Sequence, residues 1–376
     1  MTRRLVGNLL FEEELAAPRR SPSSSVLETA AGAATLLRAF AREGDRLWTP
    51  APVDPACLAP LPGIPVPILE SGPLASLPPA GELLAWGESP AVAALRPATP
   101  PPPPDLNAPL HELLWRVPPA PPGVVAAVHH RSFCLAVARD LDQALPGARM
   151  LSSPDELDRH LTTFQRSWVL KAPLSAAGRS RYIHRPGESL SDPAVRRRVE
   201  NLFARHGSLL FEPWMERTDD FGCVAVLTSS GLRVAGFHRL LVDRRGQFTG
   251  IETTASYDGG FPNLSASEGR QMEEALEAAA GALRRAGYSG PFGLDAWRYQ
   301  SPDGGTGFNP LGEINARLTF GFVARSLADR LREPLGLPPD HPLRLRLGRP
   351  PGPRKTGSVL PLFQLENGYS AAWIEN

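Results

Sequence analysis

Lysine is almost absent from this 376-residue sequence. Only Lys171 and Lys355 are present, against 38 arginines. An arginine can replace a lysine wherever charge alone matters, but not where a compact ammonium group is needed in place of a planar guanidinium group. We therefore expect Lys171 to occupy such a position, with retention by chance as the alternative.

Cysteine, net charge and long apolar runs are also scarce. The three cysteines are far apart, which excludes a disulfide scaffold or a cysteine metal site and favours a reducing compartment. The net charge of +1 gives no electrostatic reason to expect a nucleic-acid or membrane partner. No apolar run approaches the roughly 20 residues that span a bilayer, and Glu12, Glu13 and Glu14 interrupt the segment that resembles a signal peptide. We expect a cytoplasmic protein.

Proline is abundant, and it dominates the first 123 residues. Prolines recur between residues 50 and 67 and form runs at 100–104 and 118–122. They exclude regular helices there and favour stiff, packed connections over ligands for SH3-type domains. Trp48, Trp86 and Trp115 lie among them and indicate packing rather than disorder. One helix is predicted over residues 27–43.

From residue 124 onward the pattern is that of an ordinary chain of helices and strands. A strand is predicted at 124–128, ending at His129 and His130, which we interpret as structural residues rather than a metal pair. Helices are predicted at 132–144, 154–164 and 193–205, the last with Asp192 as cap and Gly207 at its end. An antiparallel meander at 223–253, a helix of about 20 residues after Ser265 and a last helix at 319–333 follow.

A short strand at 168–173 presents Lys171 and leads into a loop of small residues, 174–181. Ser175, Gly178 and Arg179 belong to this loop, and Gly178 allows backbone amides to approach an anion closely. The lysine beside it favours phosphate as that anion. A simple turn remains the alternative.

A second short strand is interrupted by Pro213. Glu212 stands directly before the proline, where strand pairing must stop. A backbone edge left free there could meet a purine ring, with Trp214 and Met215 close by. A linker between domains is the alternative interpretation.

Residues 292–317 read as a β-hairpin with turn residues in the middle. A turn centred on Gly304 places Asp295 opposite Glu313, with Asn315 two residues further along the same face. Two facing carboxylates repel each other, and a hard cation with oxygen ligands such as Mg²⁺ is the simplest way to relieve the repulsion. Arg317 follows on the same face.

Three predicted features thus follow one another along the chain: a loop that could bind phosphate, a strand edge that could meet a purine, and a hairpin that could bind Mg²⁺. Together they describe an ATP site. Neither GxxxxGK[ST] nor GxGxxG after a strand occurs, so P-loop and dinucleotide-binding folds are excluded. No Ser-His-Asp or Cys-His arrangement is recognisable either.

These elements resemble the ATP-grasp superfamily, above all in Glu313-Ile-Asn315-Ala-Arg317. The resemblance covers residues 125–335 and implies an α+β fold in which two lobes grip ATP, preceded by a further domain. The implied divisions are an N-terminal proline-rich domain at 1–123, an ATP-grasp domain at 124–335 with a lid lobe at about 150–211, and a C-terminal extension at 336–376.

The resemblance also implies a role for each motif. Lys171 and Arg131 would contact phosphates, and the loop with Ser175, Gly178 and Arg179 would close over them. The remaining implied roles are adenine for Glu212, Trp214 and Met215, ribose for Asp219 or Asp220, Mg²⁺ for Asp295, Glu313 and Asn315, and the substrate carboxylate or its acyl phosphate for Arg317.

The leading hypothesis is thus an ATP-dependent carboxylate–amine ligase with Mg²⁺ and ATP. Its carboxylate and amine substrates are not identifiable from the sequence. The alternatives are a phosphotransferase acting on a small molecule and a nucleotide-binding scaffold or regulator without turnover.

Overall fold

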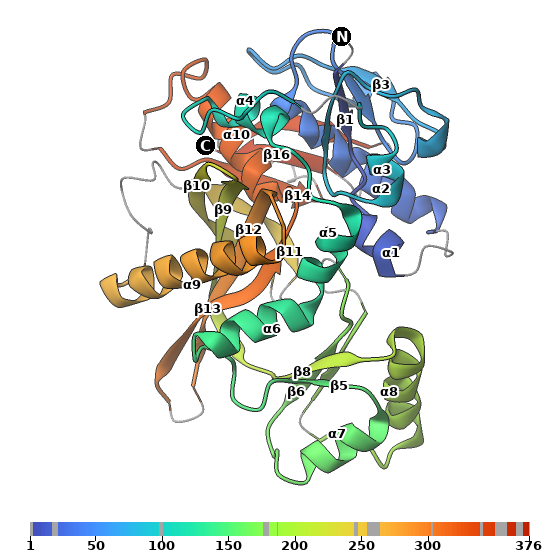
Figure 1. The fold of residues 1–376 in the computed structure, drawn as a ribbon, viewed down its shortest axis with the longest axis vertical. Coiled ribbons are helices and arrows are strands. Elements are labelled where there is room, and N and C mark those ends of the chain that lie inside the picture. The colour runs from blue at the N-terminus through green and yellow to red at the C-terminus, as the bar shows by residue number, and fades with distance from the viewer. Residues whose placement is uncertain are drawn as a thin grey trace.

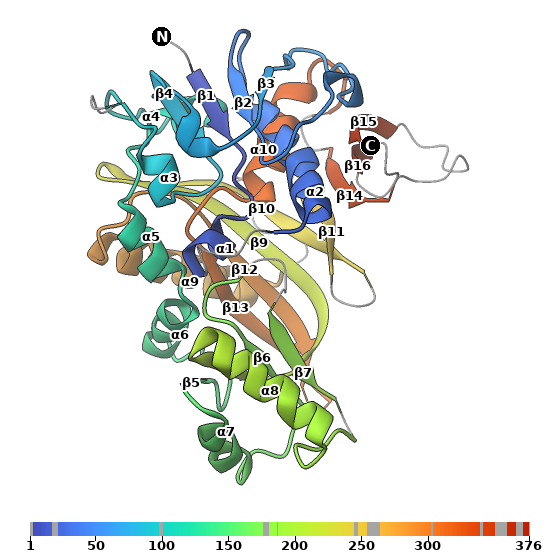
Figure 2. The same cartoon turned by 90° about the vertical axis from the view of Figure 1, so that its right-hand side faces the viewer.

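The computed structural model describes most of the chain. The described ranges are 3–16, 22–97, 101–175, 180–185, 187–243, 247–253, 264–301, 304–338, 341–349, 359–365 and 371–375. Helices and strands are both abundant, so the predicted α+β class is confirmed (Figures 1 and 2).

The N-terminal part is built around a parallel sheet of short strands in the order β3-β2-β1-β4. Its strands are β1 (Arg3–Val6), β2 (Arg46–Trp48), β3 (Ile68–Glu70) and β4 (Glu82–Ala85). The helices in this part are α1 (Phe11–Ala16), α2 (Ser24–Ala34), α3 (Pro90–Ala93) and α4 (Leu110–Arg116), with 3₁₀ turns η1 (Thr35–Phe40), η2 (Pro55–Cys57) and η3 (Leu74–Ser76). The sequence did not reveal this sheet, because three- and four-residue strands between prolines carry too little alternation to be recognised.

A second sheet forms a separate lobe, at the bottom of Figure 1. Its order is β5-β8-β6-β7, and its pairs are antiparallel. Its elements are β5 (Arg149–Leu151), α7 (Pro154–Leu161), β6 (Trp168–Lys171), β7 (Arg181–His184), α8 (Pro193–His206) and β8 (Leu209–Pro213). Asp192 caps α8 and Gly207 ends it with a φ of +72°, as predicted for these residues.

The largest sheet has eight strands in the order β13-β12-β9-β10-β11-β14-β16-β15. The strands are β9 (Glu216–Thr228), β10 (Gly231–Val242), β11 (Phe248–Thr253), β12 (Gly290–Gln300), β13 (Thr306–Asn315), β14 (Arg344–Gly348), β15 (Val359–Gln364) and β16 (Ala371–Glu375). The helices α9 (Ala266–Arg285) and α10 (Phe320–Leu331) pack against it, and α9 begins with the predicted capping box of Ser265 and Glu268.

Two helices, α5 (Pro122–His129) and α6 (Arg131–Asp140), connect the N-terminal part to the small lobe (Figure 1). The strand predicted at 124–128 is therefore wrong. The run of Val and Ala is short and apolar, and Pro122 at the helix start sets the first turn of α5 instead.

The hydrophobic core is divided in a way that separates the small lobe from the rest. One large cluster joins the N-terminal part, α5, α6 and the eight-stranded sheet. The small lobe has a core of its own: Leu151, Leu157, Trp168, Leu170, Val199, Phe203, Leu209 and Phe211. A narrow apolar seam, formed by Leu135, Leu145, Ala148, Leu210 and Trp297, connects the two.

Arg38 ties the N-terminal part to the C-terminal strands. Its side chain is 1% exposed and donates hydrogen bonds to the carbonyl oxygens of Ala59 at 2.8 Å and Leu362 at 2.9 Å. The backbone amide of Ala59 also donates to Leu362 at 3.1 Å. Burial lowers the pKa of Arg38 to about 10. The strand β15 thus completes the packing of a region more than 300 positions earlier in the chain.

Among the described residues, no helix has both the length and the apolar character needed to cross a membrane.

Candidate active site

The hairpin of β12 and β13 has the predicted register at its critical point. Asp295 pairs with Glu313, and Gly293 pairs with Asn315. Nearer the turn the pairing changes, so that Trp297 lies opposite Asn309. A bulge in β13 accounts for the change, because residues 310–312 stand opposite the single residue 296. A turn centred on Gly304 therefore describes the pairing only in the half of the hairpin away from the turn, which contains Asp295 and Glu313.

The pKa values of the two facing carboxylates are shifted in opposite directions. Desolvation, with the charge of Glu313 second, raises the pKa of Asp295 to about 7. Desolvation also opposes ionisation of Glu313, but Arg131 and Lys171 outweigh it and lower the pKa of Glu313. Asn315 donates to Asp295 Oδ2 at 3.1 Å, which brings the three predicted metal ligands together. A cation placed between them would relieve the repulsion that raises the pKa of Asp295.

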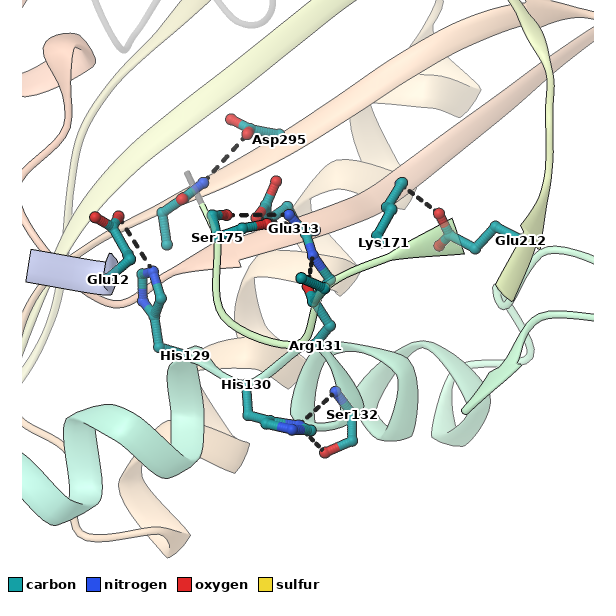
Figure 3. A network of polar contacts seen from close by, with 12 residues as sticks. Glu12, His129, His130, Arg131, Ser132, Lys171, Ser175, Glu212, Asp295 and Glu313 are labelled. Atoms are coloured by element: carbon teal, nitrogen blue, oxygen red, sulfur yellow. Dashed lines mark hydrogen bonds and ion pairs between the residues drawn. The ribbon is translucent and has the colours of Figure 1, made fainter. Parts of the chain in front are cut away.

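Arg131 connects this acidic pair to the small lobe. Its Nη1 lies 3.0 Å from Glu313 Oε1. Its Nε donates to the carbonyl of Ala172 at 3.0 Å, and its Nη2 donates to the carbonyl of Ser175 at 3.2 Å (Figure 3). Arg131 is the first residue of α6. Its contacts connect the residues that follow β6 to the β12–β13 hairpin. The predicted phosphate loop lies directly beyond this point, but Gly178 and Arg179 fall outside the described residues.

Lys171, at the end of β6, forms an ion pair with Glu212 of β8 (Figure 3). Both side chains are largely buried, at 14% and 11% exposure. Burial lowers the pKa of Lys171, and Glu212 opposes that shift. The Glu212 side chain, predicted near adenine, is thus engaged by the predicted phosphate lysine. The backbone amide of Trp214 donates to Ser167 at 2.8 Å, and the Trp214 side chain is 38% exposed.

Trp297 is a site residue that the sequence analysis missed. Its ring lies under the guanidinium carbon of Arg217 at 3.7 Å and is 5.8 Å from Lys171 Nζ. It packs in the apolar seam, where Met215 also contacts the cluster. Its position two residues after Asp295 on an alternating strand was the available signal.

The two candidate ribose acids have different surroundings. Asp219 accepts from Arg239 Nη2 at 2.6 Å and from Arg298 Nη1 at 3.1 Å. Asp220 is 7% exposed and accepts from Arg217 Nη1 at 3.0 Å. Both carboxylates are therefore held by arginines in this arrangement.

Arg317 and a buried acid from the N-terminal part form the other end of the site. Arg317 Nε donates to Glu12 Oε1 at 2.5 Å, and Arg317 Nη2 donates to Asn315 Oδ1 at 3.2 Å. His129 Nε2 lies 3.4 Å from the same Glu12 oxygen (Figure 3). Glu12 is 1% exposed; burial opposes its ionisation, but Arg317 and then His129 lower its pKa to about 2. No sequence pattern marks Glu12 as a site residue, since it begins a run of three glutamates.

The residues of the hairpin fit Mg²⁺ bound together with phosphates rather than a metal held by protein ligands alone. Within the described ranges, no group of three or more His, Cys, Asp or Glu side chains could hold a metal ion. Two carboxylates and an amide leave several positions of an octahedral ion for water and phosphate oxygens, which is the usual arrangement for Mg²⁺ beside a nucleotide.

Comparison by sequence finds no relatives. No protein-family model matches the chain, and no curated protein matches it.

Comparison by structure finds many similar chains. Biotin carboxylase from Campylobacter jejuni, solved as an ATP complex, is 12% identical with a TM-score of 0.56, and the match covers 100% of this chain and 87% of that one. Phosphoribosylamine–glycine ligase from Thermotoga maritima is 12% identical with a TM-score of 0.54, over 100% and 90%. N5-carboxyaminoimidazole synthase from Aspergillus clavatus, solved with ADP and 5-aminoimidazole ribonucleotide, is 13% identical with a TM-score of 0.53, over 100% and 94%. At these identities the likeness establishes a shared fold over the whole chain.

Proposed function

The chain has the ATP-grasp fold, and on this premise we propose that it is an ATP-dependent ligase that activates a substrate carboxylate as an acyl phosphate for attack by an amine. Mg²⁺ and ATP would bind between the small lobe and the eight-stranded sheet. The similar structures bind ATP or ADP by their own descriptions, which supports the proposal without extending to their substrates.

One observation carries the proposal: Asp295 and Glu313 face each other across the hairpin, with Asn315 bonded to Asp295. A carboxylate pair that raises the pKa of one member is an unfavourable arrangement unless a cation joins it. Cationic side chains flank the pair, with Arg131 on Glu313 and Lys171 nearby. This mixture of anions and cations suits a polyphosphate with its metal.

The residues of the chain would then divide the work of binding and positioning. Lys171 and Arg131 would hold phosphate oxygens, and the loop with Ser175, Gly178 and Arg179 would cover them. Bound Mg²⁺ would supply neutralisation of phosphate charge at Asp295, Glu313 and Asn315. Arg317 would orient the substrate carboxylate toward the γ-phosphate and stabilise charge on the acyl group.

The nucleoside would lie against the other predicted residues. Glu212, Trp214 and Met215 would border the adenine, and we add Trp297 as a flat apolar surface beside them. Asp219 or Asp220 would accept a ribose hydroxyl after exchanging one of its arginine contacts.

The test is Mg²⁺-dependent ATP binding in Glu313→Ala, measured by titration calorimetry. We expect the affinity for Mg·ATP to fall by at least about 100-fold, which is about 2.7 kcal/mol, while the circular dichroism spectrum is retained. Glu274→Ala changes an exposed glutamate on α9 and serves as the matched control. Unchanged Mg·ATP affinity in Glu313→Ala would refute the site assignment.

Product analysis separates the ligase from its alternatives. A ligase releases ADP and phosphate and forms a new amide when carboxylates and amines are supplied. ADP together with a phosphorylated small molecule would instead indicate a phosphotransferase, and ATP binding without turnover would indicate a scaffold. The divisions at residues 123/124 and 335/336 and the cytoplasmic location stay predictions.

A further inference from the structure

Glu12 is a buried acid in direct contact with Arg317, the residue predicted to face the substrate carboxylate. It lies on α1, in the N-terminal part, yet its Oε1 accepts from Arg317 Nε at 2.5 Å. His129, at the end of α5, contacts the same oxygen from a second direction. Three elements distant in sequence thus meet around one carboxylate that is 1% exposed.

The other oxygen of this carboxylate is an unused acceptor. Among the described residues, Glu12 Oε2 is buried and has no hydrogen-bond partner, and the same is true of His129 Nδ1. A buried carboxylate oxygen without a donor is strongly unfavourable, so such an atom indicates a donor that the described residues do not supply.

Arg317 has donors to spare beside this oxygen. A guanidinium group carries five N–H donors, and within the described part of the chain Arg317 uses three of them, toward Glu12, Asn315 and the carbonyl of Leu318. Arg317 and Glu12 therefore offer spare donors and a spare acceptor on two side chains in direct contact. Because the pair is neutral overall, a substrate bearing a carboxylate alone would meet the repulsion of Glu12 next to the attraction of Arg317.

We propose that the Arg317–Glu12 pair is a subsite for an α-amino acid, whose carboxylate is bound by Arg317 and whose ammonium group donates to Glu12 Oε2. The direct contact of the two side chains requires that the two charges of the ligand be adjacent, which an α-amino acid satisfies. Glu12 then determines specificity, and His129 positions its carboxylate. This inference rests on the proposed function and names the class of carboxylate that the ligase activates.

The cavity beside Arg317 is small, and Glu12 is not among its lining residues. Arg317 lines a cavity of about 30 Å³ together with Trp86, Glu88 and Tyr288. A space of this size holds one or a few water molecules. In this arrangement the pair is buried, so an amino-acid head group would reach Glu12 only when the surrounding segments open.

The experiment compares carboxylates with and without the amino group, using hydroxylamine at a fixed concentration to trap any acyl phosphate as a hydroxamate. One pool contains the common α-amino acids, and the matched pool contains the corresponding carboxylic acids without the amino group. With saturating Mg·ATP, we expect the amino-acid pool to half-saturate hydroxamate formation at a concentration at least about tenfold lower, as expected for one buried charged contact. In Glu12→Gln this preference falls to about one, while Mg·ATP affinity is unchanged.

Two further variants keep the result decisive. Glu28→Gln changes an exposed glutamate on α2 and should keep the full preference. Glu12→Asp retains the charge and should keep part of the preference for the amino-acid pool. If Glu12→Gln does not fold, the comparison of Glu12→Asp with the wild type decides the question. Equal use of both pools, or hydroxamate from the carboxylic-acid pool alone, overturns the subsite. Failure to bind Mg·ATP, or Mg·ATP binding with no hydroxamate from either pool, refutes the proposed function instead.

Discussion

At the scale of single residues, the site is a chain of charged and polar side chains in contact with one another. Glu12, Arg317, Asn315 and Asp295 are linked in that order, and Arg131 pairs with Glu313. Of the carboxylates Glu12, Asp295 and Glu313, only Asp295 has no cationic partner in direct contact among the described residues, and only its pKa rises. The sequence could predict Asp295 facing Glu313, because strand register is a local property. It could not predict Glu12, whose partner Arg317 lies 305 positions away.

Asp295 should make the metal-free protein less stable as the pH rises. Its pKa in the folded protein is about 7, against an ordinary value of 3.8, so between these values the folded state keeps a proton that the unfolded state has lost. The free energy of unfolding therefore falls from about pH 4 to pH 7 and levels off above. Asp295→Asn removes this loss. Urea unfolding with EDTA should show a gain of about 1–2 kcal/mol at pH 8. This is less than the roughly 4 kcal/mol that the two pKa values imply, because Asp295 is only partly buried.

The same comparison at pH 3, below both pKa values, supplies the control, since Asp295 is then largely protonated in both folded and unfolded chains. The gain from Asp295→Asn should shrink toward zero there. An equal gain at both pH values would show that packing, and not charge repulsion, is responsible.

At the scale of elements, the β12–β13 hairpin depends on a bulge that the sequence conceals. In the half of the hairpin next to the turn, the pairs are centred one residue before the predicted centre at Gly304. Asp295 and Glu313 still pair as predicted, because two additional residues of β13 shift the register in the half away from the turn. Gly312, inside this bulge, faces Trp297 so closely that a Cβ atom would lie 1.5 Å from the indole ring. Alternation predicts which residues share a face, but a bulge is stabilised by such tertiary contacts and leaves no periodic trace.

Gly312→Ala should therefore destabilise the protein by about 1–3 kcal/mol, because the ring of Trp297 must move in a packed seam. Gly281→Ala, in the C-terminal half of α9, is the matched control. A Cβ there meets its nearest atom at 3.4 Å, and the better helix propensity of alanine should stabilise the fold by about 0.5–1 kcal/mol. Urea unfolding measures both, and changes of the same sign would contradict the proposed contact.

At the scale of the whole molecule, the division of the core sets what can move. The small lobe has its own apolar cluster and meets the remainder through a narrow seam and the contacts of Arg131. The N-terminal part shares one continuous cluster with the eight-stranded sheet. Hydrophobic runs in the sequence predicted most of the helices and strands of both lobes, but how the cores join depends on side chains far apart in the chain.

Hydrogen exchange should resolve this division. We expect the amides of β6 and β8 to exchange through an opening that requires less free energy than the opening of β9 and β12, because fewer apolar contacts hold the small lobe. Mg·ATP should slow exchange in β6 and β8 more than in β9 and β12. Equal protection of both sheets, with and without nucleotide, would contradict an independently opening lobe.

The contacts of Arg38 connect the packing of the N-terminal part to a residue that is translated much later. The ribosome releases residue 38 long before Leu362 exists, so the buried guanidinium group has one of its two carbonyl partners missing until β15 is translated. The packing around Arg38 is thus completed by a strand that is synthesised more than 300 residues later.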